Sequence, residues 1–142
     1  MERTIHCQKL GDADTDALWE LHTLYKSEIG ESAPGQEEKR RLADAIRQGD
    51  IQFYGAWDGD RLVGCCSIAT GFSTFNYLPS GVFEDFFIRP EYRHAGIARQ
   101  LVTFARQKSG VYSLTVGCAD CDAAMYRALG FTVSLGSLLA YD

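Results

Sequence analysis

The spacing of hydrophobic residues in the first third of the chain predicts one strand followed by two helices. Thr4–Leu10 alternates between hydrophobic and polar residues, as a half-buried strand does. A helix capped by Asp14 or Thr15 is expected to run to about Ile29, and a second helix to cover Gln36–Gln48. Their inner faces are expected to carry Leu18, Leu21, Tyr25 and Ile29 in the first helix, and Leu42, Ala45 and Ile46 in the second. The second helix is otherwise strongly charged and is expected to lie at the surface.

The middle of the chain predicts three strands, over Ile51–Trp57, Leu62–Thr70 and Val82–Ile88. The first two are separated by Asp58-Gly59-Asp60, a turn sequence typical of a β-hairpin. Gly71–Ser80 is predicted to be a loop, whose aromatic residues Phe72, Phe75 and Tyr77 are exposed by chance or contact a ligand. Pro90 is expected to end the third strand, because proline lacks the N–H that a sheet requires.

The last third predicts two helices and further strands. A helix over Gly96–Lys108 precedes a strand over Tyr112–Val116. Its inner face is expected to carry Ile97, Leu101, Phe104, Ala105 and the stem of Lys108. A short helix capped by Asp120 or Asp122 is expected to stop at Gly130, and Phe131–Tyr141 to supply one or two last strands. The order β-α-α-β-β-β-α-β-α-β(β) predicts an α/β domain with a mixed, mostly antiparallel sheet and helices on both faces.

The composition indicates one soluble globular domain over residues 1–142. Hydrophobic residues make up 46% and charged residues 23% of the chain, as in ordinary globular proteins. The sequence holds no hydrophobic run long enough for a membrane span, and the stretch that begins at Met1 does not resemble a secretory signal. Five cysteines, an odd number, do not indicate a disulfide framework. We therefore expect a cytoplasmic protein that does not act at a membrane.

The distribution of charge narrows the function. A formal net charge of −5 argues against general nucleic-acid binding. Between Arg89 and Lys108, however, five residues are basic and only Glu91 is acidic, whereas the rest of the chain holds nine basic and 18 acidic residues. An acidic body with one basic segment suits an anionic cofactor beside a cationic substrate. A chance cluster on a solvated helix would produce the same count.

The turn from Arg93 to Ala98 is a candidate phosphate site. It joins a strand to the start of a helix, where free N–H groups and the helix dipole favour an anion. Its small residues allow a ligand to approach the backbone, and Arg93 supplies a guanidinium suited to phosphate oxygens. The pattern falls short of a three-glycine dinucleotide motif, so a purely structural turn remains the alternative.

Two segments together resemble the GNAT superfamily of acyl-CoA N-acetyltransferases. Val82–Ala98 is similar to the core of that family, whose pyrophosphate motif, Arg/Gln-x-x-Gly-x-Gly/Ala, is matched by Arg93, Gly96 and Ala98. Ala124–Phe131 resembles the family's tyrosine-bearing helix with its Gly-Phe exit. The run Phe-Glu-Asp-Phe-Phe at residues 83–87 looks closest to the diamine and polyamine acetyltransferase branch.

The resemblance implies roles for individual residues. Backbone groups of Phe86, Phe87 and Ile88 would pair with the pantetheine arm of acetyl-CoA. Amides of the turn would hold its pyrophosphate; the residues are Arg93, His94, Ala95, Gly96, Ile97, Ala98 and Arg99. Tyr126 would lie beside the thioester sulfur and Glu84 beside the attacking amine. The expected substrate-binding residues are Glu84, Asp85 and Phe75, and no metal is expected.

The residues also fit the chemistry. An alkyl amine with a pKa near 10.4 must lose a proton before it attacks, and a carboxylate can accept that proton directly or through a water. A phenol can donate a proton to a departing thiolate. Glu84 and Asp85 should point to opposite faces of their strand unless a bulge intervenes. Without the resemblance, a salt-bridged Glu84 and a core Tyr126 are the ordinary interpretations.

The cysteines and histidines add little to this interpretation. Many GNAT relatives carry a pantetheine-binding asparagine where this chain has Cys118-Ala119-Asp120-Cys121, so that contact is in doubt. The C-x-x-C spacing permits a redox or metal role, but no second pair completes a zinc set, and incidental cysteines are favoured. Cys65 and Cys66 are interpreted as buried strand residues, although an acyl-cysteine intermediate stays open. His94 either contributes to the turn or simply faces solvent.

The expected activity is transfer of an acetyl group from acetyl-CoA to a primary amine, by direct attack in a ternary complex. The acidic body, the paired carboxylates and the aromatic loop favour a small cationic acceptor, such as a diamine, a polyamine or an amino sugar. The alternatives are acetylation of a peptide N-terminus or lysine, and a non-catalytic acyl-CoA-binding module. Only about 12 residues follow the Gly-Phe pair, so the last hairpin is expected to be abbreviated or completed in a homodimer.

Overall fold

The computed structural model describes residues 4–142, so the first three residues of the predicted domain lie outside the described part. The strands are β1 (Ile5–Lys9), β2 (Ile51–Asp58), β3 (Arg61–Ser73), β4 (Leu78–Ile88) and β5 (Ser113–Val116). The helices are α1 (Thr15–Glu28), α2 (Gln36–Gln48), α3 (Ile97–Ser109) and α4 (Ala123–Ala128). Short 3-10 turns cover Asp12–Asp14, Pro90–Tyr92 and Asp120–Asp122.

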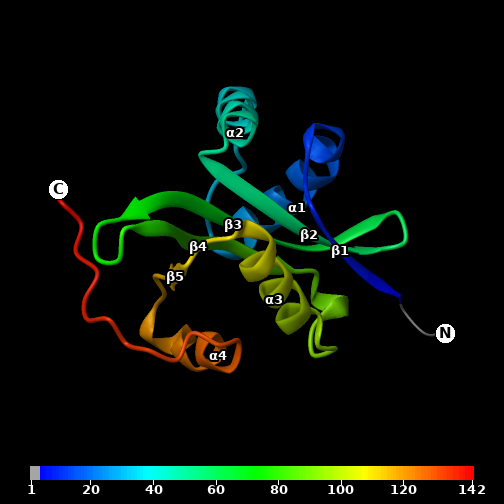
Figure 1. Cartoon of the computed structure of the whole chain (residues 1–142). Helices are drawn as coiled ribbons and strands as arrows, with labels where there is room; N and C mark the ends of the chain where they lie inside the picture. The colour runs from blue at the N-terminus through cyan, green and yellow to red at the C-terminus, as the bar shows by residue number, and fades with distance from the viewer. Residues whose placement is uncertain (1–3) are drawn as a thin grey trace.

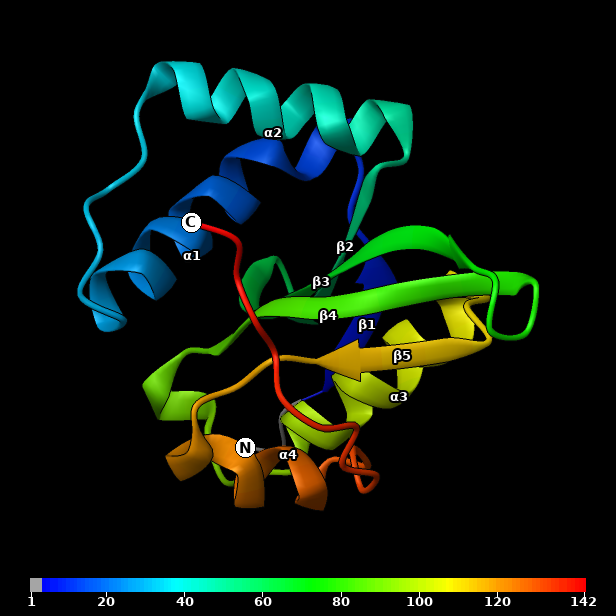
Figure 2. The same cartoon turned by 90° about the vertical axis from the view of Figure 1, so that its left-hand side faces the viewer.

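The five strands form one sheet in the order β1-β2-β3-β4-β5. Neighbouring strands are antiparallel from β1 to β4, and only β5 runs parallel to β4. Helices α1 and α2 cover one face of this sheet, and α3 and α4 lie on the other side (Figures 1 and 2). The predicted fold class, a mixed and mostly antiparallel sheet with helices on both faces, is therefore confirmed.

Each face of the sheet has its own hydrophobic core. The α3 face is built around Phe83, Ile88, Ile97 and Leu101, all buried. The α1 face is packed with Leu10, Leu18, Leu21, Phe53, Leu62, Cys65 and Phe87. Because neighbouring side chains along a strand point to opposite faces, β4 contributes Phe87 to one core and Ile88 to the other.

Most predicted elements are present, with their ends shifted by a few residues. The loop expected over Gly71–Ser80 is wrong, because β3 and β4 pair as far as Ser73 and Leu78 and leave only residues 74–77 in the turn. Within the described chain, residues 131–142 form no strand, so the predicted strands over Phe131–Tyr141 are also wrong. Side chains there extend into solvent, as Leu138 does with 88% of its surface exposed.

Two helix faces differ from the prediction. Ile29 lies just beyond α1 with 47% of its surface exposed, whereas Leu18 and Leu21 are buried as expected. In α3 the stem of Lys108 is exposed, and Val102 is buried in the core instead. Both helices therefore keep their predicted hydrophobic stripe except at the C-terminal end, where Ile29 and Lys108 are exposed.

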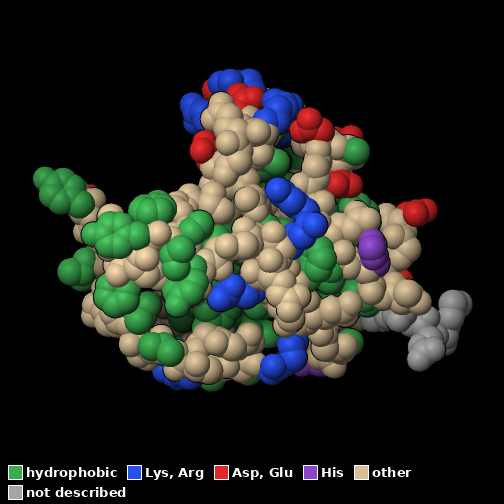
Figure 3. Space-filling model, viewed as in Figure 1, with side chains coloured by type: hydrophobic (Ala, Val, Ile, Leu, Met, Phe, Trp, Pro, Cys, Tyr) green, Lys and Arg blue, Asp and Glu red, His purple; other side chains and the backbone are tan. Residues whose placement is uncertain are grey.

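Exposed hydrophobic side chains gather at one end of the molecule, where the β3–β4 turn and the C-terminal segment lie (Figure 3). The most exposed of them include Phe72, Phe75, Tyr77, Leu135, Leu138 and Leu139. Across residues 4–142, no helix combines the length and the hydrophobicity that crossing a membrane requires.

Candidate active site

A β-bulge in β4 shapes the candidate site. Cys65 of β3 pairs with Phe87, and Ser67 pairs with Glu84. Two residues of β4, Asp85 and Phe86, therefore lie opposite the single residue Cys66 of β3. Asp85 has a φ of +54°, the left-handed conformation that accommodates an extra residue in such a bulge. Glu84 and Asp85 were expected to point to opposite faces of the strand unless a bulge intervened. This bulge is that exception, because it interrupts the alternation of side chains between the two faces.

The bulge brings both carboxylates to the α1 face of the sheet. Residues that pair across strands share a face, so Glu84 lies on the same side as Ser67 and Phe53, which packs in the α1 core. The Oδ2 atom of Asp85 accepts a hydrogen bond of 2.6 Å from Oγ of Ser67, whose side chain is fully buried. The Asp85 carboxylate is therefore fixed in place by a hydroxyl that has no access to solvent.

Tyr25 of α1 lies within electrostatic range of all the predicted catalytic side chains. The pKa of Tyr25 is raised to about 12, mainly by burial and to a smaller extent by the charges of Asp85, Tyr126, Glu31 and Glu84, in that order. Glu84 and Asp85 belong to β4, whereas Tyr126 belongs to α4 on the other side of the sheet. The phenol of Tyr25 is therefore influenced by residues from both sides of the candidate site, β4 and α4.

Tyr126 is held by aromatic contacts on the α4 side. Its ring centroid lies 5.9 Å from that of Phe131, 6.3 Å from Phe86 and 6.4 Å from Phe83. Burial raises the pKa of the Tyr126 phenol, and nearby Asp122 and Cys118 add to this effect. A raised pKa keeps the phenol protonated at neutral pH, which is the state in which it can donate a proton.

β4 and β5 separate next to these side chains. Their last paired residues are Phe83 and Val116, and β4 then continues to Ile88 without β5 beside it. The edge of β4 that carries Phe86, Phe87 and Ile88 therefore has no paired strand on the β5 side of the sheet, and we call this interruption of pairing the opening between β4 and β5. In Figure 2 the C-terminal segment crosses in front of it. An extended ligand can pair with such an edge as an added strand would.

The turn before α3 has the backbone of an anion site. His94 and Gly96 have φ values of +63° and +81°, so two left-handed residues alternate in the turn. Such backbones point successive N–H groups to one side, where they can surround an anion. Gly96 is the N-cap of α3 and provides no side-chain cap, which leaves the first amides of the helix available. His94, Ala95 and Arg99 are exposed around it, whereas Ile97 is buried and anchors the helix.

The two arginines of the turn already have partners in the protein. Arg93 donates from Nε to the carbonyl of Ile88 at 2.8 Å and forms an ion pair of 2.7 Å with Glu28 of α1. Arg99 donates to the carbonyl oxygen of Ala128 at the end of α4. These contacts attach the turn to α1 on one side and to α4 on the other, so backbone amides are the groups most available to phosphate.

Phe75 lies away from the other predicted site residues. It belongs to the β3–β4 turn, and its side chain is 95% exposed. Glu84 lies within β4, six residues beyond Leu78 where this turn ends, which is roughly 20 Å at the usual rise of about 3.3 Å per residue. Glu84, Asp85 and Tyr126 all influence the pKa of Tyr25, whereas Phe75 lies outside that group.

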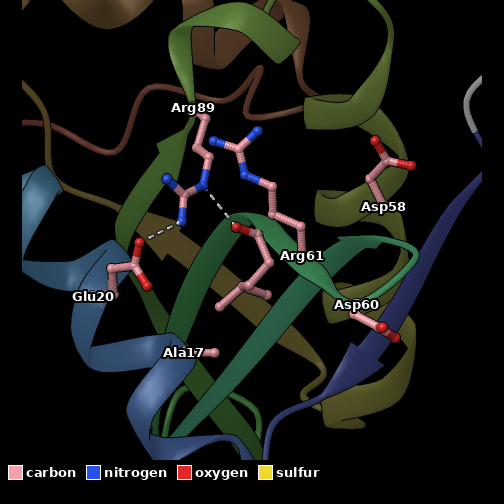
Figure 4. Close-up of a pocket in the computed structure, with 7 residues that line it drawn as sticks. Ala17, Glu20, Asp58, Asp60, Arg61 and Arg89 are labelled. Atoms are coloured by element: carbon pink, nitrogen blue, oxygen red, sulfur yellow. Dashed lines mark hydrogen bonds and ion pairs between the residues drawn. The ribbon is translucent and has the colours of Figure 1, made fainter.

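A separate cavity of about 370 Å³ lies between the first half of α1 and the β2–β3 turn. Its lining residues are Ala17, Glu20, Asp58, Asp60, Arg61, Leu62 and Arg89. Arg89 donates from Nε to the carbonyl of Leu62 at 2.8 Å and lies 3.4 Å from Glu20, as Figure 4 shows. None of these residues belongs to the predicted site.

The cysteines form no metal site in the described chain. Cys118 and Cys121 are free and exposed, and residues 4–142 contain no group of three or more side chains that could hold a metal ion. Cys65 and Cys66 are fully buried, and burial raises the pKa of both thiols. A raised thiol pKa opposes formation of the nucleophilic thiolate, so the structure gives no support to an acyl-cysteine intermediate.

Sequence reasoning missed three residues of the site. Tyr25 was predicted only as part of a hydrophobic helix face. Neither Ser67 nor His22, a buried residue of α1 whose pKa Asp85 influences, was singled out. No local motif marks them, because Ser67 is brought to the carboxylates by the pairing of β3 with β4, and Tyr25 and His22 by the packing of α1 on the sheet. The one available signal was the position of Tyr25 on the inner face, next to the charged residues Lys26 and Glu31.

The sequence itself matches the family described as "Acetyltransferase (GNAT) domain" over residues 49–133, more than half of the chain. Together with the fold and the splayed strands, this match defines an acetyltransferase. The chain belongs to the GNAT acetyltransferase family, whose members use acetyl-CoA. Among curated protein sequences, none matches the chain.

Solved structures share the fold at low sequence identity. A probable acetyltransferase has a TM-score of 0.81 and 19% identity, and the match covers 96% of this chain and 99% of that chain. An aminoglycoside acetyltransferase from an uncultured soil metagenomic sample, in complex with trehalose, has a TM-score of 0.82 and 18% identity, covering 97% and 95%. Glucosamine-6-phosphate N-acetyltransferase from Arabidopsis thaliana has a TM-score of 0.74 and 18% identity, covering 98% and 97%.

Proposed function

We propose that this chain transfers the acetyl group of acetyl-CoA to a primary amine of a small cationic molecule, by direct attack in a ternary complex. The observation that carries this proposal is the meeting of two carboxylates and a protonated phenol beside the opening between β4 and β5. The pKa of Tyr25 is influenced by Glu84, Asp85 and Tyr126 at once, which supports placing the acceptor beside this phenol.

The proposed catalytic residues have different roles on the two sides of the opening. On the α1 side, Glu84 accepts the amine proton directly or through a water, and Asp85 binds the ammonium group. On the α4 side, Tyr126 donates a proton to the leaving sulfur, for which its raised pKa is suited. Acetyl-CoA supplies the acetyl group as a thioester and needs no metal.

The same geometry supports the proposed cofactor-binding residues. The free edge of β4 at Phe86, Phe87 and Ile88 would align the pantetheine arm, and the amides of Arg93–Arg99 would bind the pyrophosphate. The left-handed residues His94 and Gly96 and the uncapped start of α3 support this assignment. Cys118 contributes to the raised pKa of Tyr126, which supports placing the cofactor sulfur on the Cys118 side of this phenol.

The acceptor is proposed to be a small molecule with more than one cationic group, as a diamine, polyamine or amino sugar has. The paired carboxylates of Glu84 and Asp85 and the net charge of −5 favour a cation. An aminoglycoside acetyltransferase and a glucosamine-6-phosphate N-acetyltransferase share the fold, and amino sugars are therefore the first acceptors to test.

A coenzyme A release assay across a panel of amines tests the proposal. The panel contains diamines, polyamines, aminoglycosides, glucosamine 6-phosphate, a lysine peptide and a peptide with a free N-terminus. Tyr126→Phe should lower kcat at least ~100-fold on any amine that is turned over, within the usual effect of an acid–base group. Tyr112→Phe is the matched control, because Tyr112 is 61% exposed and lies outside the site.

Two results would contradict the proposal. Binding of acetyl-CoA without turnover of any amine, and no effect of Tyr126→Phe, would leave no support for catalysis at this site. Turnover of the peptides alone would retain the chemistry but replace the small acceptor by a protein. A preference for acyl groups longer than acetyl would change the donor and leave the roles of the residues intact.

We also propose a cytoplasmic homodimer. β5 is an edge strand, and hydrophobic side chains of the C-terminal segment, Val133, Leu135 and Leu139, are at least 77% exposed. Exposed edges and hydrophobic patches of this kind favour association. All five cysteines are free, as in proteins of a reducing compartment. Sedimentation equilibrium would give the mass of a dimer, and the mass of a monomer would contradict this part of the proposal.

A further inference from the structure

The cavity between α1 and the β2–β3 turn is lined by a buried arginine, Arg89, whose surface is only 9% exposed. Within residues 4–142 its side chain makes two hydrogen bonds, from Nε to the carbonyl of Leu62 at 2.8 Å and from a terminal nitrogen to Glu20 at 3.4 Å. The second is longer than the usual distance of about 2.7–2.9 Å between charged partners. A guanidinium has five N–H donors, so most of them are left for another partner. Because a buried charge is costly unless it is paired and hydrogen-bonded, Arg89 is the natural anchor for an anionic group in this cavity.

A second arginine, Arg61 of β3, lines the same cavity. In Figure 4 the side chains of Arg61 and Arg89 converge. Arg61 is half-exposed and forms an ion pair of 2.9 Å with Glu91, so it adds positive charge to the cavity and less hydrogen-bonding capacity than Arg89 does. Two like charges that converge repel each other, and a carboxylate placed between them would relieve that repulsion.

Carboxylates also line the cavity, and the most exposed of them lie at its rim. Asp58 accepts a hydrogen bond of 2.6 Å from the hydroxyl of Tyr92. Asp60 is exposed in the β2–β3 turn and forms no hydrogen bond or ion pair within residues 4–142, and Glu20 has 69% of its side chain exposed. The cavity therefore has a buried cation on the inside and exposed anions at the mouth. Its volume of about 370 Å³ is within the range of about 300–1,000 Å³ of small-molecule sites.

We propose that this cavity binds a small zwitterion, a free α-amino acid, whose carboxylate contacts Arg89 and whose ammonium group faces Asp60. An anion alone would satisfy the buried guanidinium but would meet the carboxylates at the rim. A cation alone would leave the guanidinium unsatisfied. An α-amino acid carries both charges a few bonds apart, as the cavity does. None of the lining residues belongs to the proposed acetyl-transfer site, so binding here requires neither acetyl-CoA nor an acceptor amine.

Isothermal titration calorimetry of the full chain, without acetyl-CoA, tests the inference. The probes are the L-amino acids of proteins, with acetate and methylamine as molecules that carry only one of the two charges. We expect at least one amino acid to bind, one molecule per chain, with a Kd below ~1 mM and at least ~10-fold more tightly than acetate or methylamine. Arg89→Lys keeps the charge but loses the planar fork of donors, so it should raise this Kd ~10-fold. Asp60→Asn should raise it about 3–5-fold, as expected for an exposed ion pair, and Asp50→Asn is the matched control at an exposed position outside the cavity.

The inference is overturned if no amino acid binds below ~1 mM, or if acetate or methylamine binds as tightly as the best amino acid. Glu84→Gln separates this cavity from the acceptor site: it should leave the Kd unchanged, and a loss as large as that in Asp60→Asn would place the ligand beside Glu84 instead. Arg89 is buried, so Arg89→Lys is first checked for folding by circular dichroism. If that variant does not fold, Asp60→Asn decides the question, because its exposed side chain is not part of either core. An unchanged Kd in Asp60→Asn would then overturn the proposed contact with the ammonium group.

Discussion

Replacing Ser67 by alanine removes the only hydroxyl that fixes the Asp85 carboxylate in the described structure. The hydroxyl lies in β3 beneath α1, is fully buried, and donates over 2.6 Å to Oδ2 of Asp85. Alanine keeps the β-carbon and removes one oxygen, so the backbone and the bulge of β4 have no steric reason to change. The variant therefore tests the hydrogen bond itself.

The expected loss of stability follows from the burial of each partner. A hydrogen bond to a charged group contributes about 1.5–3 kcal/mol. Because Asp85 is only partly buried, water can replace some of the lost contact, and we expect about 1.5 kcal/mol, at the lower end of that range. For a chain of 142 residues this corresponds to a decrease in Tm of roughly 3–6 °C.

Urea denaturation of wild type, Ser67→Ala and Ser137→Ala measures this difference. Ser137 lies in the exposed C-terminal segment, and its replacement should change the free energy of unfolding by less than about 0.5 kcal/mol. In activity assays, Ser67→Ala should raise the KM for the amine more than the KM for acetyl-CoA, because only the carboxylate on the α1 side is released. A loss below about 0.5 kcal/mol with an unchanged KM for the amine would refute the assigned role of the hydrogen bond.

Three further predictions follow from contacts around the site. Arg93→Ala should raise the KM for acetyl-CoA about 10-fold, because the guanidinium holds the carbonyl of Ile88 beside the turn. Glu28→Gln removes only a partly exposed ion pair, so it should lower the free energy of unfolding by at most about 1 kcal/mol and change this KM little. Equal effects of the two variants on the KM would refute the distinction. Phe75→Ser should leave kcat/KM for every accepted amine within about twofold of wild type, and a larger loss would mean that the β3–β4 turn reaches the acceptor. Since the pKa of His22 is lowered on folding, its contribution to stability is complete above the unfolded value of about 6.5 and is lost as the pH falls toward the folded value. Urea midpoints of wild type should therefore fall more steeply below pH 6.5 than those of His22→Gln, and parallel curves would contradict the assignment.

The sequence alone predicted the elements whose local signals are strong. The charged α2 was predicted at its observed bounds, Gln36–Gln48, and the turn sequence at Asp58–Asp60 joins β2 and β3. Gly96 begins α3 in the left-handed conformation that glycine adopts at little cost. The order of the elements and the class of the sheet follow from such periodicity and turn signals, since each depends on neighbours within a few residues.

The last strands failed because pairing depends on a partner that periodicity does not provide. Phe131–Tyr141 is hydrophobic enough for a strand, but in the described chain it has no neighbour to pair with. The β3–β4 hairpin shows the opposite effect, because Gly71 and Ser80 extend the sheet through cross-strand pairing although their residue types favour a loop. Strand length is thus decided by what lies alongside, and sequence windows do not contain that information.

For the site, the sequence determined which chemical groups are available, namely Glu84, Asp85 and Tyr126. Tertiary structure decided how they are combined. The bulge turns Asp85 to the same face as Glu84, and the separation of β4 from β5 leaves the edge of β4 beyond Phe83 without a paired strand. The packing of α1 adds Tyr25 and His22, which no motif connects to β4. Such contacts join residues about 60 to 100 positions apart, and the physical reason that they form is burial of the two cores, a property of the whole fold.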